Sequence, residues 1–323
     1  MKGIILAGGL GTRLHPSTIS VSKQLLPIYD KPLIYYPLSN LLSAGINEIL
    51  IISTSDNIHL FKKLFGYGEH LGIKLSFEAQ DHPNGIAEAF LIGEDFIKDD
   101  DVTLILGDNI FYGNQIISHL TKQASVKCEG AKIFAYKVPD PERYGVVEFD
   151  SNFSAVSIEE KPIVPKSNFA VTGLYVYDEL VCKLAKSLTP SERGELEITD
   201  LNNLYLKEKQ LDVLLLDAGT AWLDAGTPDS LIEAAHFVQT IQNRQLIQIG
   251  CLEEISYKRG FISKDSFKRA NKKTKRRYKE SAMPKNSPMH IKPPKTKTPP
   301  SRTGAGYKGA GYKGAGYKPK GKG

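Results

Sequence analysis

The sequence contains few cysteines and no long apolar run. Its three cysteines, Cys128, Cys182 and Cys251, are far apart and include no CxxC pair. Neither a disulfide framework nor a zinc ribbon is therefore expected. No apolar run approaches the roughly 20 residues that a membrane-spanning helix needs. The N-terminal run Ile4–Ala7 is also too short for the core of a signal peptide, so we expect a cytoplasmic chain without a membrane anchor.

Charge is distributed unevenly along the chain. Residues 271–323 contain 16 Lys/Arg and one acid, a net charge of +15, whereas residues 1–270 contain 26 Lys/Arg and 35 Asp/Glu, a net charge of −9. The net charge of +6 for the whole chain therefore says little about the ligands of the acidic part. The basic part is poor in apolar residues and repeats the unit GAGYK three times. This composition predicts a disordered low-complexity tail after residue 270.

The acidic part of the chain has the pattern of an α/β protein. Residues 3–7, 48–53 and 102–106 are short and almost continuously apolar, as in parallel strands that are covered on both faces. Apolar residues at helical spacing lie between these strands, over residues 34–42 and 85–97. Alternating strands and helices imply right-handed crossovers and a doubly wound, mostly parallel, Rossmann-like sheet.

The pattern changes between residues 131 and 177, where strand-like segments are separated by turns containing Pro, Asp and Asn. We predict an inserted, smaller and partly antiparallel sheet region there. Further elements are expected as helices near residues 179–187 and 198–208 and as strands at 213–216 and 221–223. C-terminal helices should follow, the first beginning with Thr227 as N-cap and Pro228 at its first position.

The strongest local motif follows the first predicted strand. In Gly8-Gly9-Leu10-Gly11-Thr12-Arg13, glycines allow backbone N–H groups to approach a polyphosphate, and Arg13 supplies a fork of donors. The motif lacks the GK[ST] of a Walker A loop, and Leu14 stands where a dinucleotide fingerprint requires glycine. Taken alone, the motif is equally compatible with an ordinary glycine turn.

Lys23 and two acidic residues extend this candidate site. Lys23 is either a solvated surface lysine or a second cation beside the glycine loop. Asp108 and Asp224 each come at the end of a predicted strand, the edge at which parallel sheets bind ligands. Either acid could instead cap the turn or helix that follows it. Together, the two carboxylates could hold one Mg²⁺, with phosphate oxygens and water completing its coordination.

Eight segments carry a resemblance to a known family, and they occur in the order GGLGTRL, SKQLLPIYDKPLIYYPL, LGDNIFYG, DPERYGVVEFD, EEKP, NFAVTGLYVYD, RGELEITD and AWLDAGT. Over about residues 1–268 the chain closely resembles the sugar-nucleotidyltransferase family, and within it the glucose-1-phosphate thymidylyltransferases. The resemblance implies a nucleotidyltransferase domain over residues 1–270. Its nucleotide-binding part covers about residues 1–130, its sugar-phosphate-binding part about 131–226, and its C-terminal helices about 227–270.

The resemblance also assigns roles to single residues. Nucleotide binding would fall to Gly8, Gly11, Thr12, Arg13, Lys23, Gln24, Gln80, Gly85 and Asp108. Sugar-phosphate binding would fall to Asn109, Gly145, Glu160, Lys161, Val171 and Trp222. Arg13, Lys23 and Lys161 would be catalytic, and Asp108 and Asp224 would hold Mg²⁺ as the cofactor. Without the resemblance, Glu160 and Lys161 would be a solvated pair and Trp222 a core aromatic.

The implied reaction is Mg²⁺-dependent transfer of a thymidylyl group from dTTP to α-D-glucose 1-phosphate, the first step of dTDP-rhamnose or other deoxysugar synthesis for lipopolysaccharide or cell-wall polysaccharides. A close alternative is uridylyl transfer, or transfer to another sugar 1-phosphate, because Gln80 can pair with thymine or uracil. Alternatives of another class are a non-catalytic sugar-nucleotide binder and a polyanion-binding protein that acts through the basic tail. A specific nucleic-acid function of that tail is not expected, because its composition is not a motif.

The resemblance further implies a homotetramer, with feedback inhibition at a second site that draws on C-terminal elements. Two departures from the family bear on these expectations. Ala225 stands where the family more often has Thr, which removes a hydroxyl beside Asp224. After about Arg269 the chain leaves the family pattern, and this departure affects the C-terminal elements on which the second site draws.

Overall fold

The computed structural model describes residues 1–270. The predictions for residues 271–323, including the disordered tail and its binding to polyanions, lie outside the described residues. Within residues 1–270 the three cysteines are free, as expected. No helix in this part of the chain is both long and apolar enough to cross a membrane.

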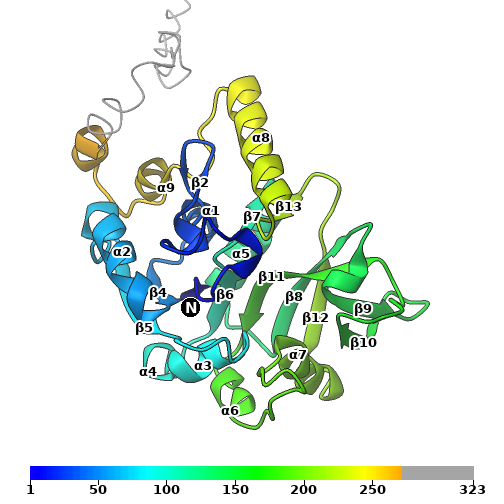
Figure 1. The fold of residues 1–323 in the computed structure, drawn as a ribbon. Helices are drawn as coiled ribbons and strands as arrows, with labels where there is room; N and C mark the ends of the chain where they lie inside the picture. The colour runs from blue at the N-terminus through cyan, green and yellow to red at the C-terminus, as the bar shows by residue number, and fades with distance from the viewer. Residues whose placement is uncertain (271–323) are drawn as a thin grey trace, which may run out of the picture. The chain divides into compact units, whose positions relative to one another are not determined.

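A nine-stranded sheet forms the centre of the described chain (Figure 1). Its strands run in the order β10-β9-β11-β6-β1-β4-β5, with β8 also beside β11 and β12 beside β8. The strands are β1 (Lys2–Leu6), β4 (Glu48–Ser53), β5 (Lys74–Ala79), β6 (Val102–Leu106), β8 (Ala131–Lys137), β9 (Gly145–Phe149), β10 (Ala155–Glu160), β11 (Phe169–Tyr177) and β12 (Leu211–Leu215).

The predicted parallel core is confirmed. β1 pairs in parallel with both β4 and β6, so that Ile5 lies opposite Ile51 and Ile105, and β4 pairs in parallel with β5. All three of these isoleucines are fully buried. Continuous apolar runs form these strands because both faces of the sheet are covered, which also makes the strands recognisable in the sequence.

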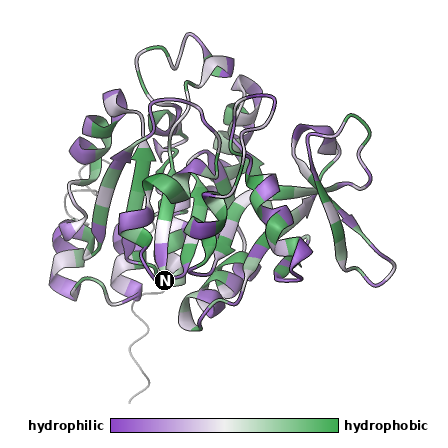
Figure 2. Cartoon of the chain, turned by 90° about the horizontal axis from the view of Figure 1, so that it is seen from below, coloured by the Kyte–Doolittle hydropathy of each residue, from purple (hydrophilic) through white to green (hydrophobic). Residues whose placement is uncertain are grey.

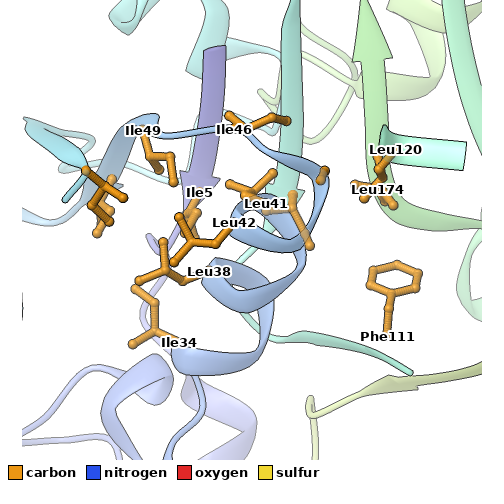
Figure 3. Close-up of a cluster of buried hydrophobic side chains, with 14 of the residues drawn as sticks. Ile5, Ile34, Leu38, Leu41, Leu42, Ile46, Ile49, Phe111, Leu120 and Leu174 are labelled. Atoms are coloured by element: carbon orange, nitrogen blue, oxygen red, sulfur yellow. The ribbon is translucent and has the colours of Figure 1, made fainter. Parts of the chain in front are cut away.

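Helices cover both faces of the sheet, which makes the fold doubly wound. One face packs against α1 (Tyr35–Ala44), α2 (Ser55–Phe65), α5 (Asn114–Ser125) and α9 (Leu252–Lys258). The other face packs against α3 (Glu88–Ile92), α4 (Glu94–Ile97), α6 (Val181–Ala185) and α7 (Ile198–Lys207). Figure 3 shows Leu38 and Leu42 of α1 beside Ile5 of β1. The strands are mostly apolar and the outer sides of the helices are polar (Figure 2).

The helix predicted over residues 85–97 is divided. The structure has α3 and α4 instead, which meet at Gly93. A Cβ on Gly93 would lie 2.9 Å from the Ala89 carbonyl oxygen and 3.2 Å from side-chain carbons of Ile4 and Leu50. The break therefore lies where the chain packs tightly onto the sheet, a tertiary feature that helical spacing does not reveal.

The strands between residues 131 and 177 are antiparallel, as predicted, but they do not form a separate sheet. β11 pairs antiparallel with β6, β8 and β9, and so joins this region to the parallel sheet. Two small antiparallel sheets pair β2 (Pro27–Ile28) with β3 (Lys31–Pro32) and β7 (Asn109–Tyr112) with β13 (Ala221–Asp224). The β7–β13 pair places Asp224 opposite Asn109, next to the end of β6.

The C-terminal helix α8 (Pro228–Gln245) begins as the sequence predicts. Thr227 is the N-cap, its hydroxyl accepts a hydrogen bond from the Ser230 N–H at 3.2 Å, and Pro228 occupies the first turn. The Ser230 hydroxyl accepts a hydrogen bond from the Thr227 N–H at 2.9 Å in return. These reciprocal bonds satisfy two backbone donors that a helix N-terminus otherwise leaves unpaired.

Candidate active site

The glycine loop after β1 leads into a short 3-10 turn, Thr12–Leu14. A Cβ on Gly8 would lie 3.0 Å from Oε1 of Gln80, so the absence of a side chain lets the loop approach the end of β5. Gly11 has a φ of 59°, and its carbonyl oxygen accepts a hydrogen bond from the Thr18 hydroxyl at 2.7 Å. Arg13 is exposed and makes no ion pair within residues 1–270.

A pocket of about 220 Å³ lies next to this loop. Five residues that the sequence assigned to nucleotide binding line it: Gly8, Gln24, Gln80, Gly85 and Asp108. They come from four separate segments, the loop after β1, the 3-10 turn Lys23–Leu25, the segment after β5, and the end of β6. Leu6, Leu106, Ile86, Pro83 and Glu195 also line the pocket, and the sequence assigned them no role.

Pro83, Gly85 and Ile86, which follow β5, form what we call the outer wall of this pocket. Within it, the backbone of Gly85 has a conformation that requires glycine. Its φ is +102°, and a Cβ there would lie 2.3 Å from the Leu196 carbonyl oxygen. The loop is fixed by hydrogen bonds from the Leu196 N–H to the Asn84 carbonyl at 2.6 Å and from the Ala87 N–H to the Leu196 carbonyl at 3.2 Å. The wall is therefore fastened to the segment that precedes α7.

Lys23 and Asp108 form an ion pair at the edge of the pocket. Lys23 Nζ lies 2.5 Å from Asp108 Oδ2, and Asn109 Nδ2 donates to Asp108 Oδ1 at 2.8 Å. Burial acts to raise the pKa of Asp108, but the Lys23 charge and the two hydrogen bonds outweigh it, so this pKa is lowered. The Lys23 side chain is only 12% exposed. Lys23 is therefore not a solvated surface lysine.

Asp224 lies close to this pair and has a cation of its own. A Cβ on Gly226 would lie 3.7 Å from Asp224 Oδ2 and 4.0 Å from Lys23 Nζ. Arg143 Nη2 donates to Asp224 Oδ2 at 3.1 Å, while Nη1 binds Asp140 at 2.6 Å. Burial, supported by repulsion from Asp108, raises the pKa of Asp224 against the opposing effect of Arg143. Arg143 lies in the DPERYGVVEFD segment but is not among the site residues predicted from the sequence.

The two carboxylates fit a magnesium ion by the chemistry of their donors. Their side chains are partly exposed, and each carboxylate lies next to a cation. Mg²⁺ in proteins is commonly held by one or two carboxylates together with substrate phosphates and water. Residues 1–270 contain no group of three or more His, Cys, Asp or Glu side chains arranged to hold a metal. Binding of Mg²⁺ by Asp108 and Asp224 stays a prediction.

The residues assigned to the sugar phosphate gather around the ends of β9 and β10. A Cβ on Gly145 would lie 3.4 Å from Glu160 Oε2 and 3.8 Å from Val171 Cβ. Glu160 Oε2 accepts a hydrogen bond from the Thr199 hydroxyl at 2.7 Å. Lys161 Nζ lies 3.3 Å from Glu160 Oε1, and the backbone of Lys161 is left-handed, with a φ of 45°. The structure thus brings these four assigned residues together.

Arg193 is a second cation that the sequence analysis missed. Its Nη2 lies 2.8 Å from Glu197 Oε1, 3.5 Å from Glu195 Oε2 and 3.8 Å from Glu160 Oε1. Arg193 therefore joins the Glu160–Lys161 group to Glu195, which lines the nucleotide pocket. Arg193 is the first residue of the RGELEITD segment, and this position is the sequence feature that could have identified it as a site residue.

Asn109 and Trp222 connect the two parts of the site. Asn109 Oδ1 accepts hydrogen bonds from Trp222 Nε1 at 2.6 Å and from the Gly173 N–H at 3.1 Å, while its amide donates to Asp108. The Trp222 ring packs against Tyr144, with ring centroids 5.2 Å apart. Asn109 thus uses its oxygen to position Trp222, and a contact of either residue with a sugar stays a prediction.

Thr12 and Arg13 are not brought into the pocket. Both are exposed, and neither lines the cavity beside Gly8. A separate pocket of about 430 Å³ lies elsewhere in the fold, and its lining includes Asn40 of α1, Gly113 and Ile255 of α9. The regulatory site implied by the resemblance stays a prediction.

The fold and this site are those of a nucleotide-transferring enzyme. The sequence pattern of the nucleotidyl transferase family matches residues 2–241, and the chain belongs to this family. Glucose-1-phosphate thymidylyltransferase of Neisseria meningitidis is 59% identical over 263 residues, which cover 81% of this chain and 91% of that protein. The enzyme of the same name from Mycobacterium tuberculosis is 52% identical over 262 residues, 81% of this chain and 90% of that protein.

Solved structures agree with these relatives. A putative glucose-1-phosphate thymidylyltransferase from Bacillus anthracis, in complex with sucrose, has a TM-score of 0.68 and 42% identity, covering 73% of this chain and 94% of that chain. A UDP-glucose pyrophosphorylase complexed with UDP-glucose has a TM-score of 0.65 at 24% identity, covering 74% of this chain and 98% of that chain. At that identity the second likeness supports the fold alone.

Proposed function

We propose that this chain transfers a thymidylyl group from dTTP to α-D-glucose 1-phosphate and releases pyrophosphate. The name and high identity of its relatives support this activity. The observation that carries the proposal is the Lys23–Asp108 pair at the edge of the pocket. Asp108 is linked through Asn109 to Gly173 of β11, and the same strand carries Val171 beside Gly145 and Glu160.

The reaction joins two anions, so charge is its main obstacle. An oxygen of the sugar phosphate attacks the α-phosphorus of dTTP in line, and the bond from that phosphorus to the pyrophosphate oxygen breaks. Lys23 stabilises the charge on the triphosphate and the departing pyrophosphate, and the same role for Arg13 follows the resemblance alone. Lys161, with Arg193 beside Glu160, orients the attacking phosphate. No general base is needed, because a sugar phosphate is already ionised near neutral pH.

Mg²⁺, when bound, would neutralise charge on the phosphate oxygens of the nucleotide. Asp108 and Asp224 are the residues that would hold it. Asp108 pairs with Lys23 and Asp224 pairs with Arg143, so each carboxylate lies next to a cation.

Other parts of the proposal follow the resemblance alone. A homotetramer, feedback regulation and a place in deoxysugar synthesis are predictions of the same account, and so is a cytoplasmic location. Uridylyl transfer is the competing activity, because an acceptor on Gln80 serves thymine and uracil equally well. The methyl group of thymine must then be distinguished by the apolar part of the pocket, where Leu6 and Leu106 lie.

Pyrophosphate release by the full-length protein tests the proposal. dTTP and UTP should each be paired with glucose 1-phosphate, galactose 1-phosphate and N-acetylglucosamine 1-phosphate in the presence of Mg²⁺. We expect the highest kcat/KM for dTTP with glucose 1-phosphate. A clear preference for UTP, or for another sugar phosphate, would replace the proposed substrates, and inactivity of folded protein with every pair would reject transferase activity.

A further inference from the structure

Gln80 faces two groups that can only accept hydrogen bonds. Its Nε2 donates to Glu88 Oε2 at 2.7 Å and to the Gly85 carbonyl oxygen at 3.1 Å. A carbonyl and a carboxylate have no proton to donate, so only the amino half of the Gln80 amide can point toward them. Glu88 is itself held in place, because Asn84 Nδ2 donates to its other oxygen at 2.8 Å.

The other half of the amide is therefore directed into the nucleotide pocket. Gln80 lines that pocket, and its Oε1 accepts no hydrogen bond within the described residues. Gly8 leaves room for this oxygen, since a Cβ there would come within 3.0 Å of it. The Gln80 side chain is only 7% exposed, so both ends of the amide are confined. The pocket thus presents a fixed acceptor to its ligand.

A fixed acceptor discriminates between pyrimidines. Thymine and uracil carry a hydrogen on N3, which can donate to Gln80 Oε1, whereas N3 of cytosine is itself an acceptor. Two acceptors that face each other in a confined site leave both unsatisfied, which costs binding free energy. If the amide were reversed, its amino group would meet N3 instead, and cytosine would become the better partner.

We propose that Glu88 is a specificity-determining positioning residue, which excludes cytosine nucleotides by fixing the orientation of the Gln80 amide. The inference rests on the proposed function, in which Gln80 meets the base. The amide introduced by Glu88→Gln could donate as well as accept, so a reversed Gln80 amide would keep a hydrogen bond to residue 88 and would lose only the one to the Gly85 carbonyl. The carboxylate of Glu88 allows only one orientation.

The test compares dTTP with dCTP in wild-type protein and in Glu88→Gln. The substitution keeps the size of the side chain and its place in the first turn of α3. Equilibrium Kd values for both nucleotides, and kcat/KM values with glucose 1-phosphate, give the preference as a ratio. We expect the preference for dTTP to fall about tenfold or more, mainly through KM and Kd, since one mismatched hydrogen bond has about this effect. A preference within twofold of wild type in folded protein would overturn the inference.

Glu94→Gln is the matched control. Glu94 lies in the first turn of α4 and pairs with Lys186, away from Gln80. This variant should keep the wild-type preference, and a matching loss there would overturn the inference because the effect would not be local to Gln80. A general loss of structure lowers the affinity and the kcat/KM for dTTP and dCTP alike, so their ratio stays unchanged. A change in this ratio therefore reports a positioning role of Glu88 and not a loss of folded protein.

The same series distinguishes the inference from the proposed function. If wild-type protein binds dTTP but forms no dTDP-glucose, the proposed function fails, while the Kd ratio still decides the role of Glu88. If wild-type protein forms dTDP-glucose and Glu88→Gln keeps its preference for dTTP, the inference fails and the proposed function stands.

Discussion

The two sides of the site differ in how their charges are held. On the nucleotide side, Lys23 is 12% exposed and lies 2.5 Å from Asp108. On the sugar-phosphate side, Lys161 is 42% exposed and lies 3.3 Å from Glu160. Water screens the second pair more strongly, so it contributes less to a fixed geometry. We therefore expect the proposed nucleotide side to be fixed before substrate arrives and the proposed sugar-phosphate side to adjust to its ligand.

Asp108 should give the largest effect, because it belongs to the less exposed of the two ion pairs and is a proposed metal ligand. Asp108→Asn should lower kcat by about a thousandfold, equivalent to ~4 kcal/mol of transition-state stabilisation. Turnover measured at saturating Mg²⁺ checks this. The control is Asp56→Asn, a change at an exposed acid in the first turn of α2, which should have wild-type activity. Near wild-type turnover of Asp108→Asn would contradict the assignment.

The rigidity of the nucleotide side can be tested at Gly85. Gly85→Ala should lower the free energy of unfolding by about 3 kcal/mol, since its Cβ would collide with the backbone of Leu196 in addition to the strain of a positive φ. Gly194→Ala is the control, because Gly194 also has a positive φ but no atom within 4 Å of a Cβ there. It should lose only about 1 kcal/mol.

Urea unfolding of the two glycine variants measures this difference. Equal losses would show that the outer wall of the pocket is free to move, and the contrast between a rigid nucleotide side and an adjustable sugar-phosphate side would then be lost.

The sugar-phosphate side should respond more mildly. Lys161→Ala should raise the KM for glucose 1-phosphate by about tenfold with a smaller change for dTTP, because a partly exposed cation is screened by water. Lys166→Ala is the control, since Lys166 lies in the same loop and pairs with Glu148 at 2.9 Å. If Lys161→Ala altered only the KM for dTTP, the division of the site into two sides would be wrong.

The smallest effect is expected from removal of residues 271–323. Every residue assigned to either side of the site lies at or before Asp224. Truncation after residue 270 should therefore leave kcat within a fewfold of the full-length value, and should abolish retention on heparin at low salt, because +15 of charge is removed. Loss of activity in a folded truncation would show that the site needs this segment.

Sequence patterns predicted the parallel core because its strands are covered on both faces. β4 and β6 have the predicted bounds, since these buried strands are almost continuously apolar. β5 was not predicted, because its residues Lys74, Ser76 and Glu78 interrupt the apolar run at the edge of the sheet. Edge strands carry such polar residues where one side faces water.

The candidate site was predicted in part for a similar reason. A motif identifies residues within one segment of the chain. Asp108 and Asp224 are predicted in this way, because each follows the apolar run of its own strand. The ion pair of Arg143 with Asp224 joins residues that are 81 positions apart in the sequence. The contact of Arg193 with Glu160 likewise joins two segments that only the folded chain brings together. Neither pairing leaves a signal within a single motif.

The central claim is that the chain joins its two substrates by direct in-line attack, with no protein nucleophile. The most direct measurement is the stereochemical course of the reaction of one diastereomer of α-thio-dTTP with glucose 1-phosphate. A single in-line displacement predicts α-thio-dTDP-glucose with inverted configuration at the α-phosphorus. Retained configuration, which requires two displacements through a nucleotidylated protein, would contradict the account.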